Sequence, residues 1–186
     1  MSVDDVTNLA QEKMQKSIDV LKHEISSIRT GRASPNLLDR VLVDYFGSPT
    51  AINALAAIAA PEPRLITIQP WDRHAMGAIE KAIQKSDLGL NPTNDGSVIR
   101  LAIPQLNEQR RKDLVKQVQR RLEESRVAIR NLRRDGVDAL RKEEKDKAIS
   151  EDELKRGQDR LQKLADQYST QADDLTKAKE REILEP

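Results

Sequence analysis

Residues 115–139 read VKQVQRRLEESRVAIRNLRRDGVDA. Apolar and small side chains recur in this stretch in steps of three and four residues, at Val115, Val118, Leu122, Ser125, Ile129, Leu132, Gly136 and Ala139. This spacing is typical of a coiled-coil seam, in which one stripe of an α-helix faces its partners. The stretch therefore predicts a long helix whose seam packs against other helices.

Two further segments, 10–28 and 154–178, carry apolar stripes of the same period. The later one should begin at a capping box, because Ser150 is followed three residues on by Glu153 and the two side chains can each accept a backbone N–H. Pro104 is a suitable entrance to the helix that contains 115–139. Three long helices with seam-type faces predict a bundle.

The middle of the chain, 31–103, differs in composition. It has 14 charged residues among 73, against 49 among the other 113, and it holds five of the seven glycines. Residues 38–46, 64–69 and 97–103 are β-rich runs bounded by Pro, Gly and Asn, which predicts strands. Asp72 can cap a short helix between the last two runs. These features indicate a small domain of strands and one helix.

We therefore expect an α+β fold in which residues 1–30 and 104–186 form an elongated three-helix bundle and residues 31–103 form an inserted β/α/β domain. The backbone crosses between the two parts twice, so the joint is a two-stranded hinge that can bend. The expected hinge residues are Thr30, Gly31, Ile103 and Pro104.

Little in the sequence points to catalysis. The chain has no cysteine, and its two histidines, His23 and His74, belong to no recognisable catalytic or metal-binding motif. The 31 carboxylates are interleaved with Lys and Arg, as on a solvated helix face. We expect no enzymatic activity, no metal and no other cofactor.

The longest nearly apolar run, 51–60, is far shorter than the roughly 18 residues that a membrane span requires. The first residues include acidic side chains and have no apolar core of the kind found in signal peptides. We expect a cytoplasmic protein without membrane contact.

The net charge of +1 conceals a polarised chain. Residues 107–134 contain ten basic and four acidic residues, and residues 143–186 contain nine basic and thirteen acidic ones. On a helix with about 100° per residue, eight cations lie within roughly 140° of one another, beside the seam: Lys112, Lys116, Arg120, Arg126, Arg130, Arg133, Arg134 and Arg141. Glu123 projects into the same sector. Arginine forks suit phosphate, but the sector could equally pair with the acidic third helix.

The chain has four aromatic residues, Tyr45, Phe46, Trp71 and Tyr168. Tyr168 lies on a seam, and we expect the other three to pack into the core of the small domain. Proteins that bind single strands stack bases on exposed rings, so base stacking is not expected. Recognition of folded RNA through its shape and its phosphates remains.

Several long motifs in one order resemble the bacterial ribosome recycling factor family. They are RTGRASPNLLD at 29–39, PEPRLITIQPWD at 61–72, SDLGLNPTNDGSVIRL at 86–101, EQRRKDLVK at 108–116 and VAIRNLRRD at 127–135. The resemblance covers essentially the whole chain. It departs from the family at Ala51, where Pro is common, and at Gly136, where Ala is usual and Gly should cost about 1 kcal/mol in a helix.

The resemblance implies a monomer in an L shape similar to transfer RNA. It also implies binding to the large ribosomal subunit and, with elongation factor G and GTP, splitting of the post-termination ribosome. Carried over residue by residue, it predicts contact with ribosomal RNA at Arg130, Asn131 and Arg133, supported by their neighbours Arg126 and Arg134. Weaker candidates lie beside the hinge and at the start of the long helix: Arg29, Arg32, Arg110 and Arg111.

The seams also allow a different function. A coiled-coil adaptor that binds another helical protein, without RNA, would carry the same heptad-like spacing.

Overall fold

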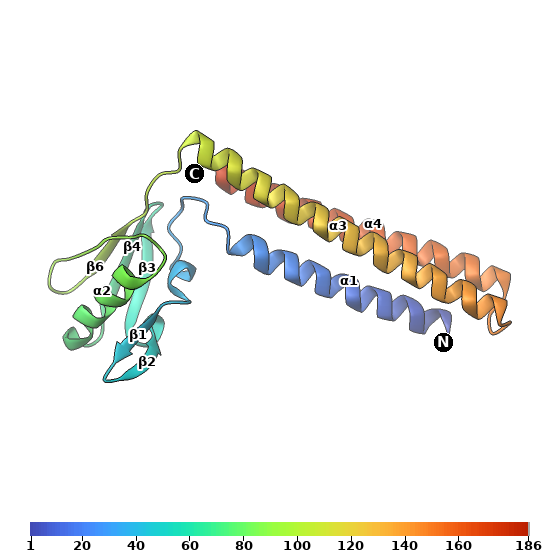
Figure 1. Cartoon of the computed structure of the whole chain (residues 1–186), viewed down its shortest axis with the longest axis horizontal. Coiled ribbons are helices and arrows are strands. Elements are labelled where there is room, and N and C mark those ends of the chain that lie inside the picture. The colour runs from blue at the N-terminus through green and yellow to red at the C-terminus, as the bar shows by residue number, and fades with distance from the viewer. Residues whose placement is uncertain (186) are drawn as a thin grey trace. The chain divides into compact units, whose positions relative to one another are not determined.

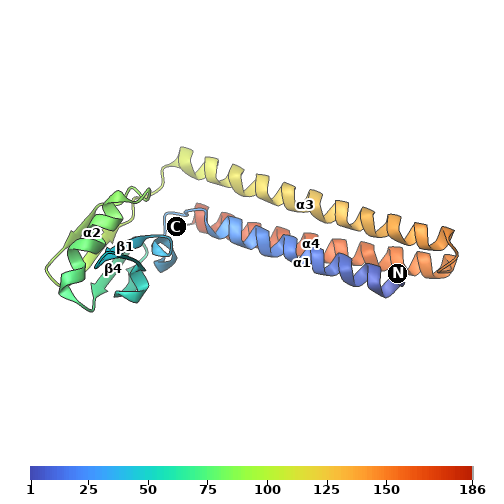
Figure 2. The ribbon, with the colours of Figure 1, turned by 60° about the horizontal axis from the view of Figure 1, so that its bottom comes forward.

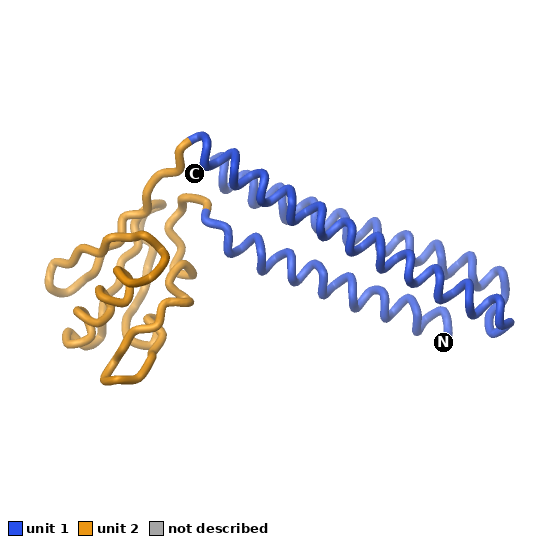
Figure 3. Tube along the Cα trace, in the orientation of Figure 1, with its two compact units in different colours: residues 1–29, 108–185 blue, residues 30–107, 186 orange. Residues whose placement is uncertain are grey.

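The computed structural model describes residues 1–185 and divides them into two compact units. Met1–Arg29 and Glu108–Glu185 form unit 1, and Thr30–Asn107 form unit 2 (Figure 3). The chain thus enters unit 2 once and leaves it once, and each unit has its own hydrophobic core.

Unit 1 consists of three long helices, α1 (Val3–Ser26), α3 (Glu108–Lys145) and α4 (Glu151–Leu184), which lie side by side (Figures 1 and 2). The capping box predicted for α4 is confirmed: the Ser150 hydroxyl accepts from the Glu153 N–H at 3.1 Å, and the Glu153 carboxylate accepts from the Ser150 N–H at 3.4 Å. A second capping box, formed by Ser2 and Asp5, starts α1.

The prediction that α3 begins at Pro104 is wrong, because the helix begins at Glu108. The Ile103 N–H donates to the Arg64 carbonyl at 2.8 Å, so the chain is still tied to the sheet of unit 2 at that point. Residues 104–107 then connect the sheet to the helix without regular structure.

In the middle of the predicted seam, Val118, Leu122, Ser125, Ile129 and Gly136 are buried in the bundle, and Leu132 is half-buried against its core. At the two ends the prediction slips by one residue: Leu114 and Leu140 are buried, whereas Val115 and Ala139 are half-buried. A strict heptad seam repeats every 3.5 residues, but a straight helix has 3.6 residues per turn. Towards each end of the helix, the buried residue is therefore one position further from the middle than the heptad spacing predicts.

Two glycines let α3 and α4 interlock. A Cβ at Gly136 of α3 would lie 2.9 Å from both Cδ atoms of Leu161 in α4, and a Cβ at Gly157 of α4 would lie 2.6 Å from Leu140 Cδ1 in α3. Both leucines have no exposed surface. Each helix therefore provides a leucine and the space for its partner's leucine, so the role of Gly136 is packing, which its helix propensity alone does not reveal.

Replacing Gly157 by Ala should destabilise unit 1 by about 1–2 kcal/mol. The added Cβ would lie 2.6 Å from Leu140 Cδ1, so overpacking should cost about 2–3 kcal/mol, the upper part of its usual range, and the gain in helix propensity returns about 1 kcal/mol. Urea unfolding followed by far-ultraviolet circular dichroism measures the change. Gly77→Ala is the control, because a Cβ at Gly77 meets nothing within 4 Å. Equal or greater stability in Gly157→Ala would contradict the interlock.

Unit 2 contains two antiparallel sheets. The hairpin of β1 (Leu42–Tyr45) and β2 (Ser48–Ala51) forms one. The other has the strand order β3-β4-β6-β5. Its strands are β3 (Ala56–Glu62), β4 (Leu65–Pro70), β5 (Pro92–Asn94) and β6 (Ile99–Ala102). The helix α2 (Met76–Lys85) packs against the hairpin and, in the core cluster, its Ile79 and Ile83 join Ile66, Ile68 and Ile99.

Three strands of this unit, β2, β3 and β5, were not predicted from the sequence. β3 covers AAIAAPE, in which alanine and proline hide the alternation of inward and outward residues. β5 forms inside the predicted turn cluster 91–96 as a three-residue edge strand that begins with proline. The first predicted strand is also shorter, because Pro35–Leu38 forms a 3-10 turn (η1). Asp72 caps another 3-10 turn, Arg73–Ala75 (η3), which leads into α2.

The turn between β5 and β6 is organised by the carboxylate of Asp95. A hydrogen bond from Arg100 (2.8 Å), together with N–H bonds from Val98 (2.9 Å) and Ser97 (3.0 Å), holds the pKa of Asp95 well below its ordinary value of 3.8. Each of these donors favours the ionised carboxylate.

Because the folded pKa is lowered, the contribution of Asp95 should be complete above about pH 4 and should be lost as the pH falls below that value. Asp95→Asn should mimic the acid state at pH 7 and speed hydrogen exchange of the Ser97 and Val98 amides. Exchange measured residue by residue, with Asp87→Asn as control, checks this. Unchanged exchange in Asp95→Asn would contradict it.

Candidate RNA-binding surface

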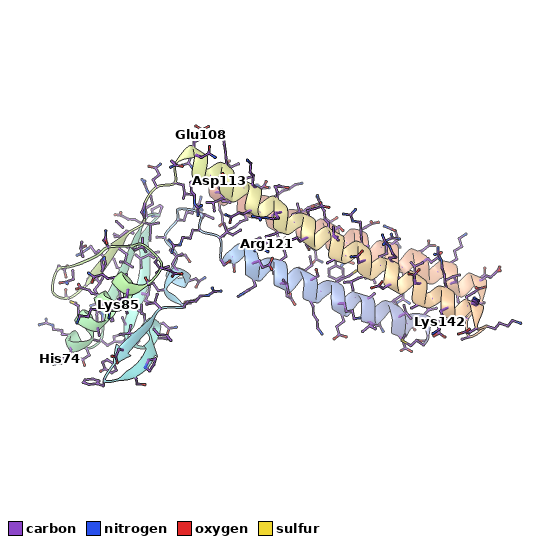
Figure 4. All side chains as sticks on the ribbon, viewed as in Figure 1. His74, Lys85, Glu108, Asp113, Arg121 and Lys142 are labelled. Atoms are coloured by element: carbon purple, nitrogen blue, oxygen red, sulfur yellow. The ribbon has the colours of Figure 1, made fainter. Side chains whose placement is uncertain are left out.

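The eight cations predicted to share one sector of the long helix do lie on one continuous helix, α3. We call them the basic face: Lys112, Lys116, Arg120, Arg126, Arg130, Arg133, Arg134 and Arg141. The seam residues of α3 are buried on its other side, so the basic face is directed away from the core. In Figure 4, the labelled Glu108 and Lys142 mark the two ends of α3 between which these side chains project.

Part of the basic face is neutralised by acidic neighbours on α3 itself. Arg130 Nη2 lies 2.9 Å from Glu123 Oε1, and Arg126 Nη1 lies 3.8 Å from Glu123 Oε2. Lys112 Nζ lies 3.3 Å from Glu108 Oε1. All of these side chains are substantially exposed to solvent, where ion pairs contribute little to stability.

The acidic helix α4 does not neutralise the basic face as a whole. Among residues 1–185, Arg126 is the one member of the face that pairs with α4, through Asp173. Arg121, which lies outside the face, pairs instead with Glu24 of α1 at 3.5 Å and with Glu124 at 3.2 Å. Ion pairs with α4 therefore do not explain why these cations gather on one face of α3.

Four cations of the face have no ion pair or hydrogen bond within the described part of the chain: Lys116, Arg120, Arg133 and Arg134. Arg133 is half-buried, and Arg134 is exposed. Their guanidinium groups can bind an external anion without first breaking an ion pair within the protein. Oxygen-rich anions such as phosphate fit this donor geometry.

Asn131 and Val127 lie close to these arginines on the helix surface. Both are exposed, and Asn131 has no hydrogen-bond partner among the described residues. An amide can donate to and accept from a ribose or a base edge, and the exposed valine offers an apolar contact. Val127 was not predicted from the sequence. At about 100° per residue it falls between Arg134 and Arg120 around the helix, and this position is the signal that could have found it.

The structure does not bring the weaker candidates into the same patch. Arg110 and Arg111 begin α3, about 20 residues or roughly 30 Å along the helix from Arg130. Arg111 is half-buried, and its Nε is buried without a hydrogen-bond partner among residues 1–185. Arg29 and Arg32 are exposed and stand at the boundary of the two units. They form a separate group near the crossing of the chain.

The prediction that Phe46 and Trp71 pack into a core is wrong, because they are 84% and 69% exposed. Phe46 and Gly47 form the two-residue turn between β1 and β2, with φ angles of 52° and 79°, and such a turn projects beyond its sheet. Tyr45 is half-buried; its ring meets Phe46 edge to face at 4.5 Å, and its hydroxyl lies 3.2 Å from Asp72 Oδ2. Low aromatic content alone therefore does not argue against ring contacts by unit 2.

Residues 1–185 contain no group of three or more His, Cys, Asp or Glu side chains arranged to hold a metal ion. None of the helices in this range has the length and apolar character needed to cross a membrane. The two histidines are exposed and belong to different units, since His23 lies on α1 and His74 in η3.

A helical bundle with a basic face, four of whose cations have no partner within residues 1–185, is typical of proteins that bind a large polyanion by charge and shape. Comparisons with known proteins give the family. The family model described as "Ribosome recycling factor" matches residues 21–184. The chain belongs to the ribosome recycling factor family.

Relatives match over nearly the full length. The ribosome-recycling factor of Carboxydothermus hydrogenoformans is 59% identical, with 98% of each chain covered. That of Dehalococcoides mccartyi strain 195 is 55% identical, covering 97% of this chain and 98% of its own. These identities extend through both units.

Solved structures agree with the fold. A solution structure of the ribosome recycling factor is 43% identical, has a TM-score of 0.80 and covers 100% of this chain and 99% of its own. A second solved structure is described as models for the T. thermophilus ribosome recycling factor and the E. coli elongation factor G bound to the E. coli post-termination complex. The matching chain is 47% identical with a TM-score of 0.67, and the match covers 99% of this chain and 100% of that chain.

Proposed function

We propose that this protein recycles ribosomes: it binds the post-termination ribosome on the large subunit and, with elongation factor G and GTP, promotes separation of the subunits and release from the messenger RNA. The observation that carries the proposal is the set of unpaired cations on α3, in a chain whose relative is described together with elongation factor G on the post-termination complex. The site of action would be the cytoplasm, and the protein would act as a monomer.

In this proposal α3 lies along ribosomal RNA. The helix has 38 residues and is therefore about 57 Å long, enough to follow several successive phosphates. Arg133 and Arg134 would bind phosphates directly, and Arg130 and Asn131 would complete the contact. Binding would depend on backbone charge and shape, so it would weaken steeply with salt.

The second part of the proposal concerns movement of unit 2 about the crossing of the chain, at Thr30, Gly31, Ile103 and Pro104. Gly31 has a φ of 79°, and a Cβ added there would lie 3.0 Å from Leu106 Cγ, so the outgoing and returning segments pack against each other at this glycine. The expected bent, tRNA-like arrangement would allow elongation factor G to displace unit 2. The partner would hydrolyse the GTP, and this chain would hydrolyse nothing.

The alternative of a coiled-coil adaptor finds no support in the bundle. The seam residues that suggested it are buried or half-buried against the chain's own helices and are not available to another protein. Sedimentation with salt-washed large subunits, with and without nuclease, separates the two functions. Binding that ignores both nuclease and salt would favour the adaptor.

Arg133→Ala should weaken binding to large subunits about five- to tenfold at low salt and should reduce the slope of log affinity against log salt by about one, as for one lost phosphate contact. Fluorescence anisotropy of labelled protein over a salt series measures both values. Arg181→Ala, an exposed arginine on α4, is the control. An unchanged affinity and slope would remove Arg133 from the surface.

Gly31→Ala should strain the crossing by about 1–2 kcal/mol, because left-handed backbone is costly for a residue with a Cβ. We expect subunit binding to persist and the splitting rate with elongation factor G and GTP, followed by light scattering, to fall several-fold.

The matched control is Gly47→Ala, which has the same φ of 79° but no atom within 4 Å of the added Cβ. Equal effects of the two substitutions, or no effect of Gly31→Ala, would argue against a hinge at Gly31.

A further inference from the structure

Glu123 occupies the middle of the basic face. At about 100° per residue its helical position falls between those of Arg130 and Arg134. Its carboxylate contacts Arg130 Nη2 at 2.9 Å through Oε1 and Arg126 Nη1 at 3.8 Å through Oε2. The side chains of Glu123 and Arg130 are 58% and 59% exposed, so both are accessible to a ligand.

Stability of the bundle does not account for this arrangement. Arg126 already has a partner across the helices in Asp173. Arg130 reaches back seven residues to Glu123, and exposed pairs of this kind add little to folding. The neighbouring Glu124 shows the contrast, because it turns to Arg121 on the side of α1 and lies outside the basic face.

We propose that Glu123 attenuates the affinity of the basic face for RNA by competing with phosphate for Arg130. This inference rests on the proposed function and deepens it. A carboxylate and a phosphate offer the same guanidinium fork the same pair of acceptor oxygens. A phosphate that approaches Arg130 must therefore displace Glu123 or bind beside its negative charge, and both weaken the contact.

The attenuation divides the face into two kinds of arginine. Arg133 and Arg134 have no internal partner in the described chain, so they bind phosphate without exchange. Arg130 exchanges one anion for another and contributes less net binding. A factor that serves many ribosomes in turn must also leave each one, and weaker contacts act mainly by raising the dissociation rate.

Glu123→Gln removes the charge and keeps the size of the side chain. We expect it to tighten binding to salt-washed large subunits about three- to tenfold at low salt and to steepen the log–log salt slope by about one. The difference should shrink at about 0.5 M salt, because the Debye length falls to a few ångströms. Slower dissociation should reduce turnover when ribosomes exceed the factor.

Glu124→Gln is the matched control, since it removes the same charge one residue away on another side of α3. A second test combines Glu123→Gln with Arg130→Ala, in which most of the gain should disappear. Equal tightening by both glutamate variants would overturn the inference, as would unchanged or weaker binding by Glu123→Gln, which would make Glu123 a residue that positions Arg130.

The Arg133→Ala measurement separates the two levels of the argument. If Arg133→Ala weakens binding and Glu123→Gln does not tighten it, the attenuation is wrong and the proposed function stands. If the unaltered protein does not bind large subunits, the proposed function fails and the attenuation fails with it.

Discussion

The packing of the α3 seam against α1 and α4 is the constraint on which the rest of unit 1 depends. Once Val118, Leu122 and Ile129 are buried, the helical period directs the arginines that lie beside the seam to the outside. The basic face is therefore held in place by the helix itself. This helix is packed against α1 and α4, and the contacts of Gly136 with Leu161 and of Gly157 with Leu140 determine how closely α3 and α4 approach.

Charge is distributed over this frame so that the surface stays positive in a nearly neutral chain. α4 carries the acidic excess, yet among residues 1–185 it engages the basic face through the single pair of Arg126 and Asp173. The remaining neutralisation comes from within α3, chiefly from Glu123. Local pairing thus adjusts the strength of the face without removing it, which a count of charges along the sequence could not reveal.

Unit 2 follows different rules. Its core of isoleucines is shared by a four-stranded antiparallel sheet and α2, and the turn of its hairpin carries the exposed ring of Phe46. The two chain segments that lead to it meet where Gly31 approaches Leu106. A Cβ added at Gly31 would lie 3.0 Å from Leu106 Cγ, so there is little space for a side chain at this position.

The sequence by itself determined what is local. The period of residues 115–139, the capping box of Ser150 and Glu153, and the β-rich runs that became β4 and β6 depend on neighbours a few residues away, and all are found in the structure. The basic sector also follows from the helical period alone.

Tertiary structure decided what depends on distant partners. β3 and β5 exist because β4 and β6 offer them hydrogen bonds, although their own residues give weak strand signals. Leu161 explains Gly136, and the placement of Phe46 on a turn explains its exposure. The same holds for the pairs of Arg121 with Glu24 and of Arg126 with Asp173, because each joins two helices and spacing along α3 does not contain that information.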